Sequence, residues 1–277
     1  MKRRALVVAA LLASSPAAAE RPERADRTRP TITWERIYVR AGVLHMTPLS
    51  QSDEIVLSGV DGPASLAVTA GPIAGSGVAL DPFTKPAVIA GYVLPIWNDR
   101  LSLETVLSTP LRVKFRATGS LADMSIAPDA LGIPTGVPPL GAELGEADAA
   151  PPMVTAVYRL ATLGPVRPYA GAGVNVLLTY NPRATNPVLT EVEEPTFHVD
   201  PALGLVLQTG FDVALWRRVH LRADVKYVAF MKAHATVSNL HVRTPSIPLF
   251  ESAEVGQATM DMWVNPLILQ LGVGVDL

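Results

Sequence analysis

Apolar and polar residues alternate with a period of two along three long segments of the chain. From Leu101 the odd-numbered residues are mostly leucine, threonine, valine and phenylalanine, whereas the even-numbered ones include Glu104 and Arg112. The same pattern recurs over residues 219–237 and 259–277. Successive side chains of a β-strand point to opposite faces, so this period predicts strands with one apolar face and one polar face.

The length of these segments favours a membrane barrel over a soluble sandwich. Each alternating segment runs for about sixteen residues, whereas strands of globular proteins usually have ~5–6 and a strand of ~9–11 crosses a bilayer. We therefore expect the apolar faces to contact lipid and the polar faces to line a narrow lumen. In the alternative, a soluble sandwich, a second sheet would cover the apolar face.

Eight strands can be assigned, and the connections between them alternate in length. The short turns span residues 98–100, 162–167 and 216–218, and the long segments span 48–86, 118–152, 181–201 and 238–258. Short turns on one rim and long loops on the other are typical of outer-membrane barrels. The sequence thus predicts an all-β fold, an eight-stranded antiparallel up-and-down transmembrane β-barrel. Its strands are expected at 34–47, 87–97, 101–117, 153–161, 168–180, 202–215, 219–237 and 259–277.

The N-terminus has the three parts of a secretory signal peptide. Basic residues at 2–4 precede a short apolar segment, and three alanines at 17–19 form an A-x-A cleavage site. The apolar segment is too short to span a bilayer, which needs ~20 residues. We expect residues 1–19 to be removed on export, 20–33 to form a flexible periplasmic tail and 34–277 to form the barrel. This arrangement predicts the outer membrane of a Gram-negative cell as the location.

The composition agrees with a membrane barrel and excludes several other classes. The 277 residues include 23 Lys+Arg, 25 Asp+Glu, 25 Pro and 20 Gly, and only 17% are charged, against ~25% in typical soluble domains. The mean hydropathy is +0.28. The prolines and glycines argue against long helices. The formal net charge of −2 argues against nucleic-acid binding, and the absence of cysteine excludes disulfides and thiolate metal sites.

Several segments resemble the outer membrane protein W family, and they occur in the same order. Residues 167–175, Arg-Pro-Tyr-Ala-Gly-Ala-Gly-Val-Asn, are similar to its R-P-Y-V-G-A-G-x-N segment almost residue for residue. Residues 38–42, 98–110 and 265–277 are similar to its first strand, its turn into the third strand and its ending. The resemblance implies an eight-stranded barrel with a narrow, largely apolar lumen that admits small hydrophobic molecules. The chain departs from such barrels at Leu277, where they usually end in an aromatic residue.

The inward-facing positions predict two layers in the lumen. Toward the long loops we expect an apolar lumen site formed by Leu44, Met46, Tyr92, Leu94, Val106, Val228, Phe230, Met260 and Met262. Toward the short turns we expect a lumenal charge network of Glu104, Arg112, Lys114, Asp212, Arg222, Asp224 and Lys226. Flexible methionines and aromatic residues suit a permissive site for apolar ligands. The alternative, in which these side chains only fill a narrow barrel, stays open.

The sequence contains no pattern that predicts a catalytic, cofactor or metal site. The five histidines lack H-x-x-x-H spacing, and Gly171-Ala172-Gly173 lacks the third glycine of a dinucleotide-binding motif. Ser102 and Ser108 lie in no G-x-S-x-G motif, and the inward carboxylates have cations nearby, as in salt bridges. We therefore expect a protein that is not an enzyme.

Two functional hypotheses follow. The first is a monomeric outer-membrane channel or binding port for small hydrophobic molecules, with outer-membrane lipids and hydrophobic solutes as its partners. The alternative is a structural or interaction barrel with a plugged lumen, whose long extracellular loops contact partners.

Overall fold

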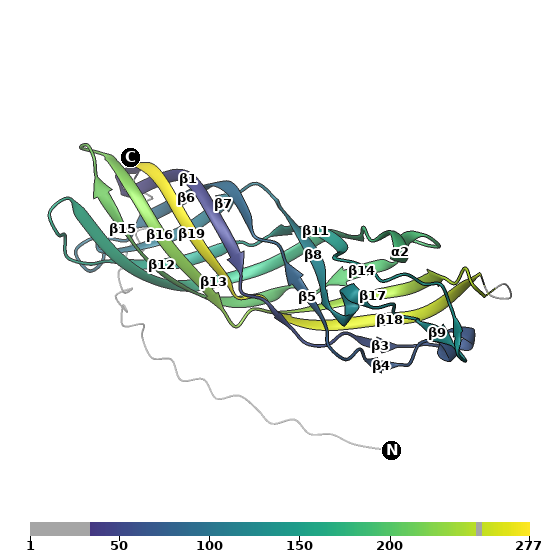
Figure 1. Cartoon of the computed structure of the whole chain (residues 1–277). Coiled ribbons are helices and arrows are strands. Elements are labelled where there is room, and N and C mark those ends of the chain that lie inside the picture. The colour runs from purple at the N-terminus through teal and green to yellow at the C-terminus, as the bar shows by residue number, and fades with distance from the viewer. Residues whose placement is uncertain (1–33, 248–250) are drawn as a thin grey trace, which may run out of the picture. The chain divides into compact units, whose positions relative to one another are not determined.

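The computed structural model describes residues 34–247 and 251–277, so the predicted signal peptide and tail lie outside the described residues. Eight antiparallel strands of the described chain form a closed barrel (Figure 1), which confirms the predicted fold. Each strand pairs with the next, and the last pairs with the first from Tyr38↔Asp276 to Pro48↔Pro266. The barrel strands are β1 (Ile37–Pro48), β6 (Phe83–Val93), β7 (Leu101–Ser108), β12 (Met153–Arg159), β13 (Val166–Ala184), β15 (Ala202–Ala214), β16 (Val219–Ala229) and β19 (Pro266–Asp276).

The alternation of residues on β16 and β19 places them as the sequence predicts. Arg222, Lys226 and Gln270 are buried in the lumen, whereas Leu221 and Leu269 are exposed on the outer face. Because side chains alternate strictly along a strand, these five positions show which residues of both strands face the lumen and which face outward. The outer face is the apolar one, as contact with lipid requires.

Three of the predicted strands are each two strands in the structure, so the prediction of uninterrupted strands was wrong for them. The breaks fall at Pro110, at Phe230 with φ of 61°, and before Pro266. Proline lacks the backbone donor, and a positive φ is incompatible with an extended strand. The pieces beyond the breaks are β8 (Leu111–Gly119), β17 (Lys232–Arg243) and β18 (Ser252–Trp263).

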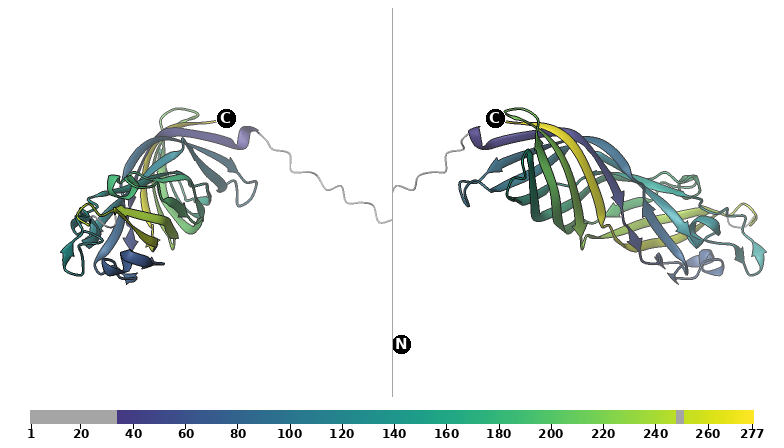
Figure 2. Two further views of the ribbon diagram at one scale, coloured as in Figure 1. Left: turned by 90° about the vertical axis from the view of Figure 1, so that its right-hand side faces the viewer. Right: turned by 60° about the vertical axis from the view of Figure 1, so that its left-hand side comes forward.

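Beyond the barrel, the chain forms two smaller sheets that together we call the extension (Figure 2). In the first sheet, the C-terminal part of β13 pairs with β11 (Glu143–Ala150), which is followed in the sheet by β8 and β5 (Ser76–Leu80). The second has the order β14 (Thr196–Val199), β17, β18, β3 (Val56–Ser58) and β4 (Gly71–Pro72), with β2 (Gln51–Ser52) paired to β18. The segments predicted as long loops therefore contribute strands.

Short elements complete the described chain. They are η1 (Trp34–Arg36), η2 (Gly62–Leu66), α1 (Ser120–Asp123), α2 (Pro187–Thr190) and the hairpin of β9 (Asp129–Ala130) and β10 (Ile133–Pro134). Within the described ranges, no helix has the length and hydropathy needed to cross a membrane. The main apolar core occupies the extension and the end of the barrel next to it, where side chains from both sheets of the extension meet.

Two glycines allow tyrosine rings to lie across the neighbouring strand inside the barrel. A Cβ atom at Gly91 would lie 2.1 Å from Cζ of Tyr38, and one at Gly210 would lie 2.4 Å from the hydroxyl oxygen of Tyr169. Both tyrosines are almost fully buried. Close approach of this kind requires residues without a side chain, and the two rings fill the lumen toward the short turns.

Candidate functional site

A network of ion pairs fills the barrel lumen toward the short turns. The Arg222 guanidinium donates to both carboxylate oxygens of Glu104, each at 2.9 Å, and to Oδ2 of Asp224 at 3.3 Å. The Lys226 ammonium donates to Asp224 and, at 3.1 Å, to Oε1 of Gln270. All five side chains are buried. A bidentate arginine–carboxylate pair of this kind stabilises charges that are removed from water.

Neutral side chains complete this network. The hydroxyl of Tyr169 donates to Oδ2 of Asp224 at 2.8 Å, and the guanidinium of Arg222 lies 4.3 Å from the centroid of its ring. Nε2 of Gln208 donates to Oδ2 of Asp224 at 2.7 Å and to Oε2 of Glu104 at 3.0 Å. Sequence analysis missed Tyr169 and Gln208, although both lie on inward positions of their strands.

The network continues toward the short turns through Arg40, another buried residue that sequence analysis missed. Nη2 of Arg40 donates to Oδ1 of Asp276 at 2.6 Å, and its Nε lies 3.9 Å from Oδ1 of the buried Asp212. Its even position on β1 shares the inward face of Leu44, so the alternation alone could have indicated it. Three buried cations therefore face three buried anions, and we call these six residues the charged layer: Arg40, Glu104, Asp212, Arg222, Asp224 and Lys226.

Arg112 and Lys114 lie outside the lumen, so their assignment to the charge network was wrong. On β7 the even-numbered residues face inward, but after the break at Pro110 the odd-numbered residues of β8 are the buried ones. The side chain of Arg112 is 57% exposed, and its Nε lies 3.6 Å from Oδ1 of Asp148 on β11. The alternation of apolar and polar residues continues through the break, so it gives no sign that the buried residues change from even-numbered to odd-numbered.

A second group of charges lies on the outer face of β17 and β18. Nζ of Lys232 lies 2.7 Å from Oδ2 of Asp261, and Nδ1 of His234 lies 2.6 Å from Oδ1. Hydrogen bonds from Lys232 and then from His234 lower the pKa of Asp261 below its ordinary value. The stabilisation is present above the unfolded pKa and is lost as the pH falls through the folded one. Since the group is largely solvated, its contribution is small.

An apolar cavity, which we call the inner cavity, lies in the barrel lumen next to the charged layer, on the side nearer the extension. Val228 and Ile268, which line it, are the next inward residues after Lys226 and Gln270 on their strands. The cavity has a volume of about 70 Å³, and among the described residues that line it only Asn175 and Thr179 are polar. Its apolar lining includes Met46, Met153, Met231, Met260, Met262 and Val264. Flexible methionines suit a site that adapts to differently shaped apolar ligands.

Six of the nine residues predicted for the apolar lumen site lie on the inward face. The other three do not. Phe230 is 72% exposed at the break after β16, and Met231 is buried in its place. The inward residues are Leu44, Met46, Val106, Val228, Met260 and Met262.

Tyr92 and the following Leu94 face outward, because the inward residues of β6 are the odd-numbered ones. Tyr38, which is inward on β1, pairs with Gly91, and Ile89 is fully buried. The prediction for this strand was wrong by one residue. Residues 87–94 are all apolar or glycine, so the segment has no alternation from which the facing could be read.

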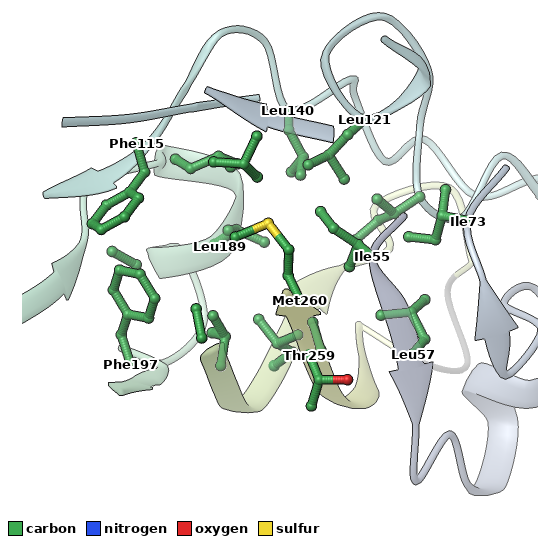
Figure 3. A pocket seen from close by; sticks show the side chains of 18 of the residues that line it. Ile55, Leu57, Ile73, Phe115, Leu121, Leu140, Leu189, Phe197, Thr259 and Met260 are labelled. Carbon is green, nitrogen blue, oxygen red and sulfur yellow. The ribbon is translucent and has the colours of Figure 1, made fainter. Parts of the chain in front are cut away.

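A second apolar cavity, the outer cavity, lies between the two sheets of the extension (Figure 3). It has a volume of about 100 Å³, and Thr259 is the only polar residue that lines it in the described chain. Its walls include Leu57 from β3 and Ile55 just before that strand, with Leu121 from α1 and Leu189 from α2. Sequence analysis missed this cavity because it treated these segments as loops, although their isolated apolar residues were a signal.

The barrel wall beside the inner cavity lacks ladder pairs over a short stretch. Among the described residues, the pairing of β6 with β7 ends at Ala87↔Ser108, and that of β5 with β8 starts at Leu80↔Phe115. Phe83, which pairs with Met46 of β1 but with no residue of β7 or β8, lines the inner cavity. Three prolines, which cannot donate to a ladder, lie in this interval: Pro82, Pro86 and Pro110.

The pairing of β7 and β8 with the strands on their other side, β12 and β11, is also interrupted. The pairing of β7 with β12 ends at Thr105↔Val154, and that of β8 with β11 resumes at Leu111↔Ala149. Nδ2 of the buried Asn175 lies 3.2 Å from the carbonyl oxygens of both Pro151 and Pro152 and donates to them. Thr109 and Pro110 thus pair with neither neighbouring strand in the described chain. We call this stretch without ladder pairs the wall opening.

Replacing Asn175 with Ala should loosen the wall at Pro151 and Pro152, because it removes the side-chain donor to two carbonyl groups. Loss of a buried partner costs about 1–3 kcal/mol. Hydrogen exchange by mass spectrometry should show faster exchange in β12, while β16 and β19, far from this clamp, keep their rates. Equal exchange in β12 of the variant and the wild type would show that Asn175 does not hold the wall.

No metal site is apparent, since no three His, Cys, Asp or Glu side chains come together anywhere in residues 34–247 and 251–277. In the described chain the inner and outer cavities are apolar, whereas a third cavity, lined by Arg40, Arg159 and Asp212 among others, is polar. The inner and outer cavities can therefore hold an uncharged, apolar molecule.

Comparison with known proteins assigns the chain to a family. The family model described as the OmpW family matches residues 37–276. The chain is 26% identical over 171 residues to the dibenzothiophene metabolism operon protein PahQ of Pseudomonas aeruginosa, covering 60% of this chain and 67% of that protein. It is 34% identical over 92 residues to the uncharacterized outer-membrane protein y4mB of Sinorhizobium fredii, covering 32% of this chain and 36% of that protein.

The fold is shared with a solved outer-membrane protein. The crystal structure of OprG from Pseudomonas aeruginosa matches with a TM-score of 0.62 and 18% identity, covering 86% of this chain and 94% of that chain. At this identity the match shows the fold alone. With the family model spanning nearly all of the barrel and extension, the chain is an outer-membrane β-barrel that belongs to the OmpW family.

Proposed function

We propose that the protein is a port through which small apolar molecules enter the outer membrane from outside the cell. The observation that carries this proposal is the contact between the two apolar cavities. Phe115, Ala235 and Met260 line both of them, so apolar side chains follow one another from the extension into the upper lumen. The proposal includes the expectation that the protein is monomeric and not an enzyme.

The charged layer gives this route its direction. Glu104, Arg222, Asp224 and Lys226 and their neutral partners are buried and hydrogen-bonded to one another between the inner cavity and the short turns. The buried Arg40 and Asp212 lie 3.9 Å apart, nearer the short turns. An apolar molecule that moved straight on would have to separate these groups and leave them unpaired, which is costly in a confined interior. We therefore propose that solutes do not continue along the barrel axis.

The wall opening supplies the exit in this proposal. It borders the inner cavity, because Phe83 and Leu111 lie beside the unpaired stretch and line the cavity. An apolar molecule that leaves sideways there enters the hydrocarbon of the membrane without being exposed to water. The name of PahQ, which refers to an operon for metabolism of dibenzothiophene, an apolar aromatic compound, supports solutes of this chemical class.

The second candidate is the structural barrel with a plugged lumen. The tightly bonded charged layer favours it, since it closes the axis of the barrel. The two candidates differ in one respect that can be measured. A port moves apolar solutes and is blocked by filling the inner cavity, whereas a structural barrel is indifferent to both.

Filling the inner cavity should block uptake. Ala233 on β17 is buried and lines this cavity, and a change to Phe should exclude the solute. The added ring takes up space in a cavity of about 70 Å³, so we expect uptake to fall to the rate of cells without the protein. The measurement is the rate at which intact cells take up N-phenyl-1-naphthylamine, whose fluorescence rises in phospholipid.

The matched control is Ala229→Phe, which adds the same ring on an outward position of β16. It should leave uptake unchanged. Comparable uptake by the two variants, both shown to be folded by their heat-dependent mobility on gels, would contradict the proposed role of the inner cavity.

A further inference from the structure

We propose that Phe115 and Met260 form a filter that limits the width of the solutes that pass from the outer to the inner cavity. This inference rests on the proposed function and adds the residues that set its selectivity. It follows from the position of these side chains, since they and Ala235 are the three that line both cavities.

The three residues approach from opposite sides of the route. Phe115 lies on β8 in the first sheet of the extension, whereas Ala235 and Met260 lie on β17 and β18 in the second and face each other in the ladder. All three are buried. The route is therefore narrowed by one aromatic ring on one side and by a methionine beside an alanine on the other.

The ring of Phe115 is held in place by a second ring. Its centroid lies 5.2 Å from that of Phe197, with an angle of 73° between the planes, which is a favourable edge-to-face contact. Figure 3 shows Phe115 and Phe197 together at one end of the outer cavity, with the side chain of Met260 extending into its middle. One side of the filter is thus rigid.

The other side can adapt. Methionine has three rotatable bonds and a polarisable sulfur that makes favourable contacts with aromatic rings, whereas the small Ala235 leaves room beside it. A rotation of Met260 therefore admits a flat, narrow solute but cannot remove the fixed ring of Phe115. We infer that the filter favours flat aromatic molecules and excludes wider ones.

Two variants that widen the filter test this inference. Phe115→Leu removes the rigid ring, and Met260→Ala removes the thioether. Cells that make each variant are given naphthalene and the wider pyrene, and uptake of both probes is followed by fluorescence. A change of one or a few methylene groups in an apolar pocket alters discrimination about tenfold, so the ratio of pyrene to naphthalene uptake should rise by about that factor.

The control is Phe211→Leu, which removes a ring from the outer face of β15 and should leave the ratio unchanged. Heat-dependent gel mobility confirms that each variant is folded, and Met260→Leu, which conserves volume, provides a variant expected to fold with a nearly unchanged ratio. A folded Phe115→Leu or Met260→Ala protein with the wild-type ratio would overturn the filter while leaving the port intact. If wild-type cells take up neither probe faster than cells without the protein, the port itself fails, and the filter with it.

Discussion

Replacing Arg222 with Leu should lower the free energy of unfolding by about 3–5 kcal/mol, which is the cost of leaving a buried ion without its partner. Arg222 is 1% exposed, and its guanidinium donates to both carboxylate oxygens of Glu104. Without it, Glu104 keeps only neutral donors, and Asp224 loses one of its two cations. Urea unfolding of the protein reconstituted in lipid vesicles measures the difference.

The matched control is Arg112→Leu, since Arg112 is exposed and its Nε lies 3.6 Å from Asp148. Exposed ion pairs contribute about 0–1 kcal/mol, so this variant should unfold almost as the wild type does. The double variant Arg222→Leu with Glu104→Leu should recover much of the lost stability, because removing both partners leaves no unpaired charge. If Arg222→Leu and Arg112→Leu cost the same, the charged layer is not the buried network described above.

An arginine in place of Leu269 should reduce stability by about 2–4 kcal/mol, the cost of a cation facing lipid near the middle of the membrane. Leu269 is 46% exposed on the outer face of β19, opposite the buried side of the strand. Its ladder partner Val225 is also an outward apolar residue. The measurement is again unfolding in lipid vesicles, with assembly of the barrel in cells as a second readout.

The control for this variant is Leu131→Arg. Leu131 is 79% exposed in the β9–β10 hairpin, outside the barrel strands, where we expect water rather than lipid. An exposed substitution in water usually changes stability by no more than about 0.5 kcal/mol. Similar losses from the two arginines would mean that the outer face of the barrel strands is not the face that contacts lipid.

The extent to which the sequence predicts this molecule depends on whether polarity alternates within each strand. On β16 and β19 it does, and the inward placement of Arg222, Lys226 and Gln270 is confirmed. On β6 every residue near Tyr92 is apolar or glycine, so the facing could not be read, and the prediction was wrong by one position. The predicted number of barrel strands was correct despite this error, because it was assigned from the turns and the loop lengths and not from which residues face inward.

The site was predicted less completely than the barrel, for two physical reasons. A break at Pro110 reverses which residues are buried, so Arg112 and Lys114 lie outside the lumen. The alternation of apolar and polar residues does not change at this break and therefore could not indicate it. The outer cavity is lined by residues from segments distant in sequence, such as Leu57 and Phe115, and no local pattern indicates that they share a cavity. Their arrangement follows from tertiary packing alone.

The central claim is that the barrel moves small apolar molecules, and uptake by intact cells tests it most directly. Cells are required because an apolar probe crosses plain phospholipid unaided, whereas the outer leaflet of lipopolysaccharide slows it. The account predicts that cells making the wild-type protein take up N-phenyl-1-naphthylamine faster than matched cells without it, and that Ala233→Phe removes the difference. Equal rates with and without the wild-type protein would contradict the account and leave the structural barrel as the better explanation.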